Sequence, residues 1–181
     1  MKEPYIFQSE RLGFRNWIQS DVLNMSTINA DPKVMEFFPV IATHQQTEAF
    51  VKRMQEQFEQ KGFCYFAVDR LDIGEFIGFI GISEQTYESN FTPCVDIGWR
   101  LARKQWGKGY ATEGAKRCLE YAFNELGLVK IMSVCPEVNK HSEVVMQKIG
   151  MRKVKTFDHP LLVSYEWLKS CVLYEIERTS C

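Results

Sequence analysis

The sequence predicts one α/β domain over residues 1–181, in which helices cover a β-sheet. Apolar runs typical of strands alternate with segments whose apolar residues recur at helical spacing. The chain has 181 residues, a length typical of one domain with a substantial core. Its hydrophobic content of 45% and charged content of 25% are those of an ordinary globular protein.

The first third of the chain predicts one strand and two helices. Residues 11–17 alternate enough to form a strand. A helix is expected to begin at Ser20 and to end before Asp31-Pro32, since the residue before a proline disfavours helix. A longer helix is expected from about residue 43 or 47 to Lys61, because its apolar residues lie on one face.

The middle of the chain predicts a hairpin, a central strand and a long helix. Residues 63–69 and 75–82 are expected to pair around a turn at 71–74. Residues 84–93 are polar and irregular, so a loop is expected there. The apolar run 95–101 predicts the central strand, and the helical pattern after it reaches about Leu126.

The last third predicts three strands and a short helix. A strand is expected over 130–135, followed by a helix with Asn139 as its N-cap and Gly150 as its stop. Residues 151–157 and 172–177 are expected to complete the sheet.

Gly107-Lys108-Gly109 lies between the central strand and the long helix. Two glycines this close allow a tight turn with free N–H groups, and a helix start adds more of them, which favours phosphate binding. The segment lacks the spacing of a Walker loop. It is not a dinucleotide fingerprint either, because Thr112 occupies the place of the third glycine.

Several separated segments together resemble the GNAT acyl-CoA N-acetyltransferases, in the branch related to ribosomal-protein serine and alanine N-terminal acetyltransferases. Lys104 to Gly109 has the spacing of the pyrophosphate loop of that family, with lysine in the first position. The other matching segments, in chain order, are 9–12, 31–35, 96–101, 110–114 and 139–151.

This resemblance implies a fold, an activity and a cosubstrate. The GNAT fold has a mixed, mostly antiparallel sheet of six to seven strands, flanked by about four helices and splayed between its central strands. The implied activity is acetyl transfer from acetyl-CoA to a primary amine, by direct attack in a ternary complex and without a metal. The amine would belong to a protein or peptide N-terminus or to a small molecule.

The resemblance also implies which residues hold acetyl-CoA. Backbone N–H groups of the glycine loop would hold the pyrophosphate, and two lysines could add charge. Main-chain groups of the central strand would pair with the pantetheine arm. The residues implied are Ile97, Trp99, Leu101, Lys104, Gly107, Lys108, Gly109, Tyr110, Ala111, Thr112, Asn139 and Ser142.

Protonation of the departing thiolate requires an acid. Many GNAT enzymes place a tyrosine seven residues after the asparagine of the second motif, but Met146 stands there and cannot donate a proton. Ser142 matches the serine that the ribosomal-protein branch uses instead, and its hydroxyl could act directly or through water. A serine in a first helical turn also commonly bonds nearby backbone groups.

Deprotonation of the acceptor amine requires a base, and the sequence leaves its identity open. Asp96 and Glu84 are the carboxylate candidates, either directly or through water. His159, on the loop between the last two strands, has an intrinsic pKa suited to proton transfer. Glu113 is less attractive, because a carboxylate in a first helical turn is expected on electrostatic grounds alone.

Composition limits the partners. The net charge of -1 gives no general attraction to nucleic acid or to an anionic membrane, so neither is expected as a partner. The six cysteines lack Cys-x-x-Cys spacing, the three histidines lack ligand spacing, and no run resembles a membrane span. We therefore expect a cytoplasmic protein without a metal. Homodimers are common among relatives of this family, and the sequence leaves the oligomeric state open.

The acceptor pocket is expected to have an aromatic wall, and its substrate stays open. Candidates for the wall are Phe37, Phe38, Pro39, His159, Tyr165 and Trp167. Two alternatives to the acetyltransferase remain: a catalytically silent protein that binds or senses acyl-CoA, and an antibiotic-modifying acetyltransferase.

Overall fold

The computed structural model describes residues 4–178 and contains an eight-stranded sheet in the order β1-β2-β3-β4-β5-β6-β8-β7. All neighbouring strands are antiparallel except β5 and β6, which are parallel. The strands are β1 (Phe7–Gln8), β2 (Leu12–Arg15), β3 (Tyr65–Arg70), β4 (Glu75–Gln85), β5 (Cys94–Leu101), β6 (Lys130–Pro136), β7 (Arg152–Asp158) and β8 (Ser170–Glu177).

The predicted mixed and mostly antiparallel sheet is confirmed, with one strand more than expected. The additional strand, β1, has two residues and pairs Phe7 with Phe14 of β2. A segment this short carries no readable alternation, so the sequence pattern does not reveal it.

Four α-helices accompany the sheet: α1 (Asp21–Asn29), α2 (His44–Lys61), α3 (Tyr110–Glu120) and α4 (Lys140–Lys148). Thr43, not Thr47, begins α2, because its hydroxyl accepts from the Gln46 N–H while the Gln46 side chain accepts from the Thr43 N–H. The predicted extension of the third helix to about Leu126 is present as a π-helical turn over Tyr121–Glu125.

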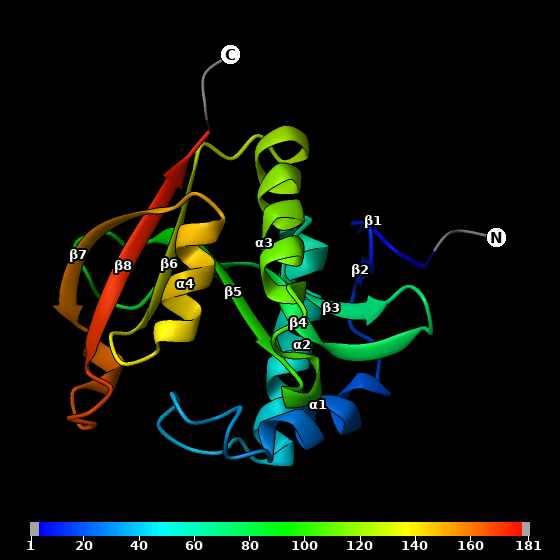
Figure 1. Cartoon of the computed structure of the whole chain (residues 1–181), viewed down its shortest axis with the longest axis horizontal. Helices are drawn as coiled ribbons and strands as arrows, with labels where there is room; N and C mark the ends of the chain where they lie inside the picture. Colours follow the sequence, from blue (N-terminus) through cyan, green and yellow to red (C-terminus); the bar gives the residue numbers. More distant parts are fainter. Residues whose placement is uncertain (1–3, 179–181) are drawn as a thin grey trace.

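The helices cover opposite faces of the sheet. On one face α3 packs against β4, where a Cβ at Gly114 would lie 2.4 Å from Ile80 Cδ1. On the other face α2 packs over β4, with Phe50 and Phe79 rings 5.3 Å apart. Because neighbouring residues of a strand point to opposite faces, Phe79 and Ile80 place the two helices on opposite sides. Figure 1 shows α3 and α4 in front of the strands, with β6, β7 and β8 to one side of β5 and β1–β4 to the other.

β4 is longer than predicted. The loop expected from Glu84 begins two residues later, because Glu84 pairs with Val95 and Gln85 pairs with Cys94. This extension places Ser83 and Gln85 on one face of the sheet, beside Asp96 of β5.

The predicted separation of the central strands is confirmed. β5 and β6 pair in register only at Asp96 and Met132, beyond which a single bond, from Ser133 Oγ to the Ile97 carbonyl oxygen at 3.0 Å, joins them. We call the opening beyond these residues the splay. Within residues 4–178, the structure contains no helix long and apolar enough to cross a bilayer.

Candidate active site

The glycine loop presents a row of free backbone donors. Gly107 and Gly109 have φ values of 74° and 83°, a left-handed conformation that glycine adopts without steric cost. The N–H groups from Gly107 to Thr112 donate no hydrogen bond to any residue between 4 and 178. Since α3 begins at Tyr110, its positive end points at the same place. Free N–H groups at a helix start are a geometry that favours anion binding.

Side chains from distant strands hold this loop in place. Arg11 of the segment before β2 donates to the Lys108 carbonyl oxygen at 3.1 Å, and its Nε lies 2.6 Å from a Glu113 oxygen. Gln105 is buried and donates to Glu75 of β4 at 3.1 Å. Glu113 therefore serves as an anchor for the loop.

Both lysines of the loop are already engaged. Lys104 is ion-paired with Glu75, and Lys108 Nζ donates to Gln105 Oε1 at 3.0 Å. Both side chains are exposed.

β5 offers an unpaired edge to the splay. The Ile97 carbonyl oxygen points toward β6, where Ser133 donates to it. Because main-chain groups alternate in direction along a strand, those of Trp99 and Leu101 point the same way. The Leu101 oxygen accepts from Trp106 Nε1 at 2.9 Å, so Trp99 supplies the free N–H and carbonyl at this edge. The side chains of Ile97 and Leu101 are buried in the core.

The start of α4 lies at the end of β6. Asn139 is the N-cap, as predicted, since its Oδ1 accepts from the Ser142 N–H at 3.1 Å. The Ser142 side chain is partly buried, and its hydroxyl makes no hydrogen bond with the residues that the structure describes. Met146 is buried in the core with 1% of its surface exposed.

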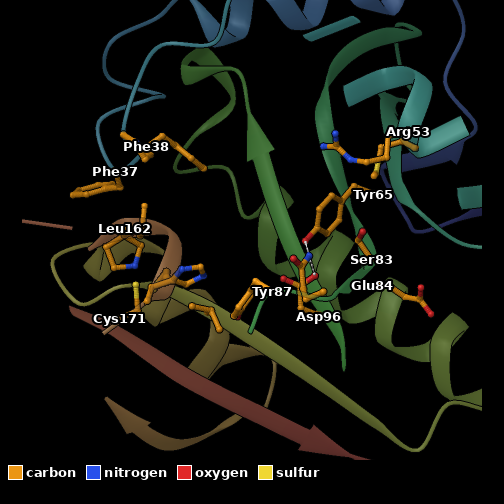
Figure 2. A pocket seen from close by; sticks show the side chains of 17 residues that line it. Phe37, Phe38, Arg53, Tyr65, Ser83, Glu84, Tyr87, Asp96, Leu162 and Cys171 are labelled. Carbon is orange, nitrogen blue, oxygen red and sulfur yellow. Dashed lines mark hydrogen bonds between the residues drawn. The ribbon is translucent and has the colours of Figure 1, made fainter. Parts of the chain in front are cut away.

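A pocket of about 370 Å³ lies beside the splay. Figure 2 shows Phe37, Phe38 and Leu162 on one side, Arg53, Tyr65 and Ser83 on the other, and Tyr87 and Asp96 between them. The remaining lining residues are Pro39, Met54, Glu84, Gln85, Val134, Cys135, Pro136, His159 and Cys171. Residues 134–136 belong to β6 beyond its pairing with β5, so the pocket reaches the splay.

Asp96 is the carboxylate at the centre of this pocket. Tyr65 Oη donates to Asp96 Oδ1 at 2.5 Å and Gln85 Nε2 donates to it at 3.1 Å (Figure 2). Burial raises the pKa of Asp96 to about 6, and the two hydrogen bonds oppose that rise. The carboxylate is therefore ionised at neutral pH yet far more basic than an exposed aspartate.

Comparisons with known proteins agree with this geometry. The family profile described as "Acetyltransferase (GNAT) domain" matches residues 11–152. The chain belongs to the GNAT family. It is 30% identical over 160 residues to the uncharacterized N-acetyltransferase YnaD of Bacillus subtilis, covering 88% of this chain and 89% of that one.

Solved structures show the same GNAT fold. An acetyltransferase of this family from Bacillus anthracis has a TM-score of 0.77 at 29% identity, covering 94% of this chain and 96% of that one. The ribosomal-protein-S5-alanine acetyltransferase of Vibrio fischeri has a TM-score of 0.75 at 18% identity, covering 94% and 95%. This GNAT protein is thus an N-acetyltransferase of a family that uses acetyl-CoA, and its neighbours include ribosomal-protein acetyltransferases.

The pocket brings together the three base candidates of this GNAT enzyme, in different surroundings. Asp96, Glu84 and His159 all line it. Glu84 Oε1 is ion-paired with Lys61 Nζ at 2.6 Å. His159 Nδ1 accepts from the Leu161 N–H at 3.2 Å, so the neutral ring carries its proton on Nε2. Burial lowers the pKa of His159.

Other contributors to the pocket were not recognised in the sequence. Tyr65 and Gln85 are 31 and 11 residues from Asp96, and they meet it only because β3, β4 and β5 are neighbours. A tyrosine in a strand is typical of a core position, and the sequence predicts a loop at Gln85. Of the aromatic wall predicted, the pocket includes residues 37–39 and His159 but not Tyr165 or Trp167.

The cysteines and possible metal ligands complete the description of the site. Cys135 and Cys171 line the pocket as free thiols, and burial, the largest cause, raises the pKa of each to about 12. Cys181 lies outside the described residues. Between residues 4 and 178, no group of three or more His, Cys, Asp or Glu side chains is arranged to hold a metal ion.

Proposed function

We propose that this protein transfers acetyl from acetyl-CoA to a primary amine by direct attack, with Asp96 as the base and Ser142 as the acid. The observation that carries the proposal is the position of Asp96. It is the residue at which β5 and β6 separate, and its carboxylate also lies in the pocket. One side chain thus stands where a cosubstrate in the splay and an amine in the pocket would meet.

The chain fits acetyl-CoA in three places. Six free N–H groups from Gly107 to Thr112 suit its pyrophosphate, and a Cβ at Gly107 would find no atom within 4 Å, so the loop is open to a ligand. The free main-chain groups of Trp99 suit the amides of the pantetheine arm. When bound, acetyl-CoA supplies the thioester carbon that the amine attacks and the thiolate that departs.

Asp96 would prepare the amine. An α-amino group has a pKa of about 7.7–8.0 and a lysine-like amine about 10.4, so both are largely protonated at neutral pH. The ionised carboxylate binds the ammonium and accepts one of its protons, directly or through one water. The nitrogen lone pair then becomes free to form the new N–C bond. Tyr65 and Gln85 hold the carboxylate in position.

Ser142 would act on the other side of the reaction. Its hydroxyl is free of hydrogen bonds with the described residues, while its N–H is fixed by Asn139. It can therefore donate its proton to the sulfur as negative charge develops there, so that a thiol leaves. The second proton that the nitrogen loses when the N–C bond forms would return to the serine oxygen, directly or through water. Met146 cannot serve in this role, since it is buried in the core.

The surroundings of Glu84 and His159 favour Asp96 as the base. Glu84 shares its charge with Lys61, and 39% of each side chain is exposed. The lone pair of neutral His159 is used by the Leu161 N–H. Asp96 alone among the three combines partial burial, hydrogen bonds that fix it and a pKa near 6.

The test is release of free thiol from acetyl-CoA with a panel of primary amines and with peptides that have free N-termini. We expect Asp96→Asn to lower kcat/KM by about 100-fold, the usual size of a general base contribution, and Ser142→Ala by about tenfold or more. Asp158 is an exposed carboxylate on β7, so Asp158→Asn makes the same chemical change at another place. This matched control should keep full activity. Acetyl-CoA binding without thiol release for any amine would contradict the proposal and favour a binding protein.

A further inference from the structure

We propose, on the basis of the proposed function, that the acceptor carries a single positive charge next to an aromatic or apolar body. The pocket is suited to such a monoamine and not to a polyamine or an aminoglycoside. The argument depends on the charges and side chains that line the pocket.

The lining residues offer one uncompensated negative charge. Three of them carry a full charge: Arg53, Glu84 and Asp96. Glu84 is neutralised by Lys61 at 2.6 Å. Among residues 4–178, Asp96 has only neutral hydrogen-bond donors, Tyr65 and Gln85, so its charge stays available for one ammonium group.

Among the lining residues, Arg53 carries the one uncompensated positive charge, and it lies on the rim. Arg100, which also makes no ion pair with residues 4–178, packs against the Phe38 ring. Arg53 of α2 is exposed and makes no ion pair with residues 4–178. In Figure 2 it lies beyond Tyr65, on the side of the pocket opposite Phe37 and Phe38. A second ammonium on the acceptor would meet this guanidinium and would lose water without gaining a counter-ion.

The wall opposite Arg53 is apolar, and Arg100 packs against it. Phe37, Phe38 and Leu162 form it (Figure 2). The Arg100 guanidinium carbon lies 4.0 Å from the centre of the Phe38 ring, and Arg100 Nη1 donates to Asn29 Oδ1 at 2.8 Å. These contacts make Arg100 a positioning residue for the wall.

The size and the surroundings of the pocket agree with a small apolar group. A volume of about 370 Å³ is near the lower end for small-molecule sites. Exposed apolar side chains continue both pocket segments along the chain: Val40 and Ile41 follow Pro39, and Leu161 and Val163 flank Leu162. Two sources share this chemistry, a free arylalkylamine and a peptide N-terminus that begins with an aromatic residue.

The test compares kcat/KM for 2-phenylethylamine, a peptide beginning with phenylalanine, spermidine and kanamycin, with acetyl-CoA as donor. We expect at least one of the first two to exceed spermidine and kanamycin by about tenfold or more. Preference for phenylethylamine would identify a free amine as the source, and preference for the peptide an N-terminus; both support the inference. Preference for spermidine or kanamycin would overturn it.

Charge reversal on α2 gives a sharper readout. Arg53→Glu should raise kcat/KM for spermidine about tenfold, whereas Lys52→Glu, the same change on the neighbouring exposed residue, should not. Equal effects of the two variants would overturn the inference, because the charge would then act from the surface in general.

Calorimetry separates this inference from the proposed function. Binding of phenylethylamine or the phenylalanine peptide, without thiol release, would uphold the inference and contradict the proposed function. Thiol release with polyamines only would uphold the proposed function and contradict the inference. Absence of binding by both aromatic ligands would overturn the inference.

Discussion

Asp96 shows how one residue can be adapted to chemistry by its neighbours. Its charged form is disfavoured by burial and is partly restored by the hydroxyl of Tyr65 and the amide of Gln85. Gly98, two residues further along β5, leaves room for this arrangement, since a Cβ there would lie 3.3 Å from the Tyr65 ring. Asp96, Tyr65, Gln85 and Gly98 thus form one unit.

The pH dependence of the reaction should report this unit. Because the proposed base is the ionised form of Asp96, kcat/KM should fall as the pH falls through about 6. Tyr65→Phe keeps the ring that stacks on Phe79 at 5.2 Å but removes a hydrogen bond that lowers the pKa of Asp96. The acid limb should therefore move up by about one pH unit. Tyr121→Phe, whose hydroxyl donates to the Gly62 oxygen, is the control.

The same residue should limit stability. The folded pKa of Asp96 is raised from 3.8 to about 6, so its stabilising protonated form is fully present below pH 3.8 and is lost as the pH rises through about 6. Because an asparagine at this position cannot ionise, the Asp96→Asn variant does not lose this stability as the pH rises. We expect the free energy of unfolding to rise by about 1–2 kcal/mol at pH 8, a value reduced for the open pocket, and by much less at pH 4. Urea unfolding at both pH values measures this, and a destabilised variant at pH 8 would contradict it.

At the scale of elements, the glycine loop depends on backbone conformation. Gly107→Ala places a side chain on a residue with φ 74°, which strains the backbone by about 1 kcal/mol. The loop can relieve this strain only by changing its backbone conformation, which turns the N–H groups away from their common direction. The Kd for acetyl-CoA should rise about tenfold. Gly74→Ala is closely matched, with φ 65° and no atom within 4 Å of the added Cβ, but it lies in the β3–β4 turn. Gly74→Ala should lower the free energy of unfolding by a similar amount and leave the Kd for acetyl-CoA unchanged. Equal Kd values for the two variants would contradict the role assigned to the glycine loop.

Elements on the acceptor side are joined by a buried ion network. Arg15 of β2 donates to Asp21 at the start of α1 at 2.7 Å and to Asp69 of β3 at 2.7 Å, and the Asp21 side chain is 2% exposed. Removing the guanidinium leaves two carboxylates buried without a cation. Such unpaired charges are among the most destabilising changes in a protein.

Arg15→Met should therefore lower the free energy of unfolding by about 3–5 kcal/mol. Arg103→Met, an exposed arginine outside this network, should change it by less than about 0.5 kcal/mol. The triple change of Arg15→Met, Asp21→Asn and Asp69→Asn should recover part of the loss. A loss for Arg15→Met no larger than that of the control would show that the network contributes little.

At the scale of the whole molecule, the splay divides the sheet into two parts that meet at few points. β5 and β6 are joined by the register pair of Asp96 with Met132 and by the hydrogen bond from the Ser133 hydroxyl to the Ile97 carbonyl oxygen. A ligand seated in the splay would replace the missing strand pairing and connect both parts.

Amide hydrogen exchange can detect that ligand without any reaction. We expect coenzyme A to slow exchange of the Trp99 N–H and of the N–H groups from 107 to 112, which are free of protein partners in the structure. The N–H of Gly74, already bonded to the Arg70 oxygen, should be unaffected. Protection confined to other segments would place the ligand elsewhere.

Much of this molecule follows from local pattern. The helix α2 and its end before Gly62 were predictable because capping depends on neighbouring residues, while the sequence left its start open between Thr43 and Thr47. The role of Asn139 as a cap was predictable for the same reason. The glycine loop and its position before a helix were also predictable from the sequence. The resemblance of this segment to the GNAT family predicted the fold, which the comparisons confirm.

Other features were decided by tertiary structure. The short strand β1 exists only because β2 offers it a partner. Tyr65 reaches Asp96, and Arg100 reaches Phe38, across strands and loops that are remote in sequence. The sequence by itself determined most of the helices and strands and the position of the glycine loop, because these depend on residues a few positions apart. Only the tertiary structure decided which carboxylate is partly buried, fixed by hydrogen bonds and open to the pocket, since burial and hydrogen bonding depend on which strands become neighbours.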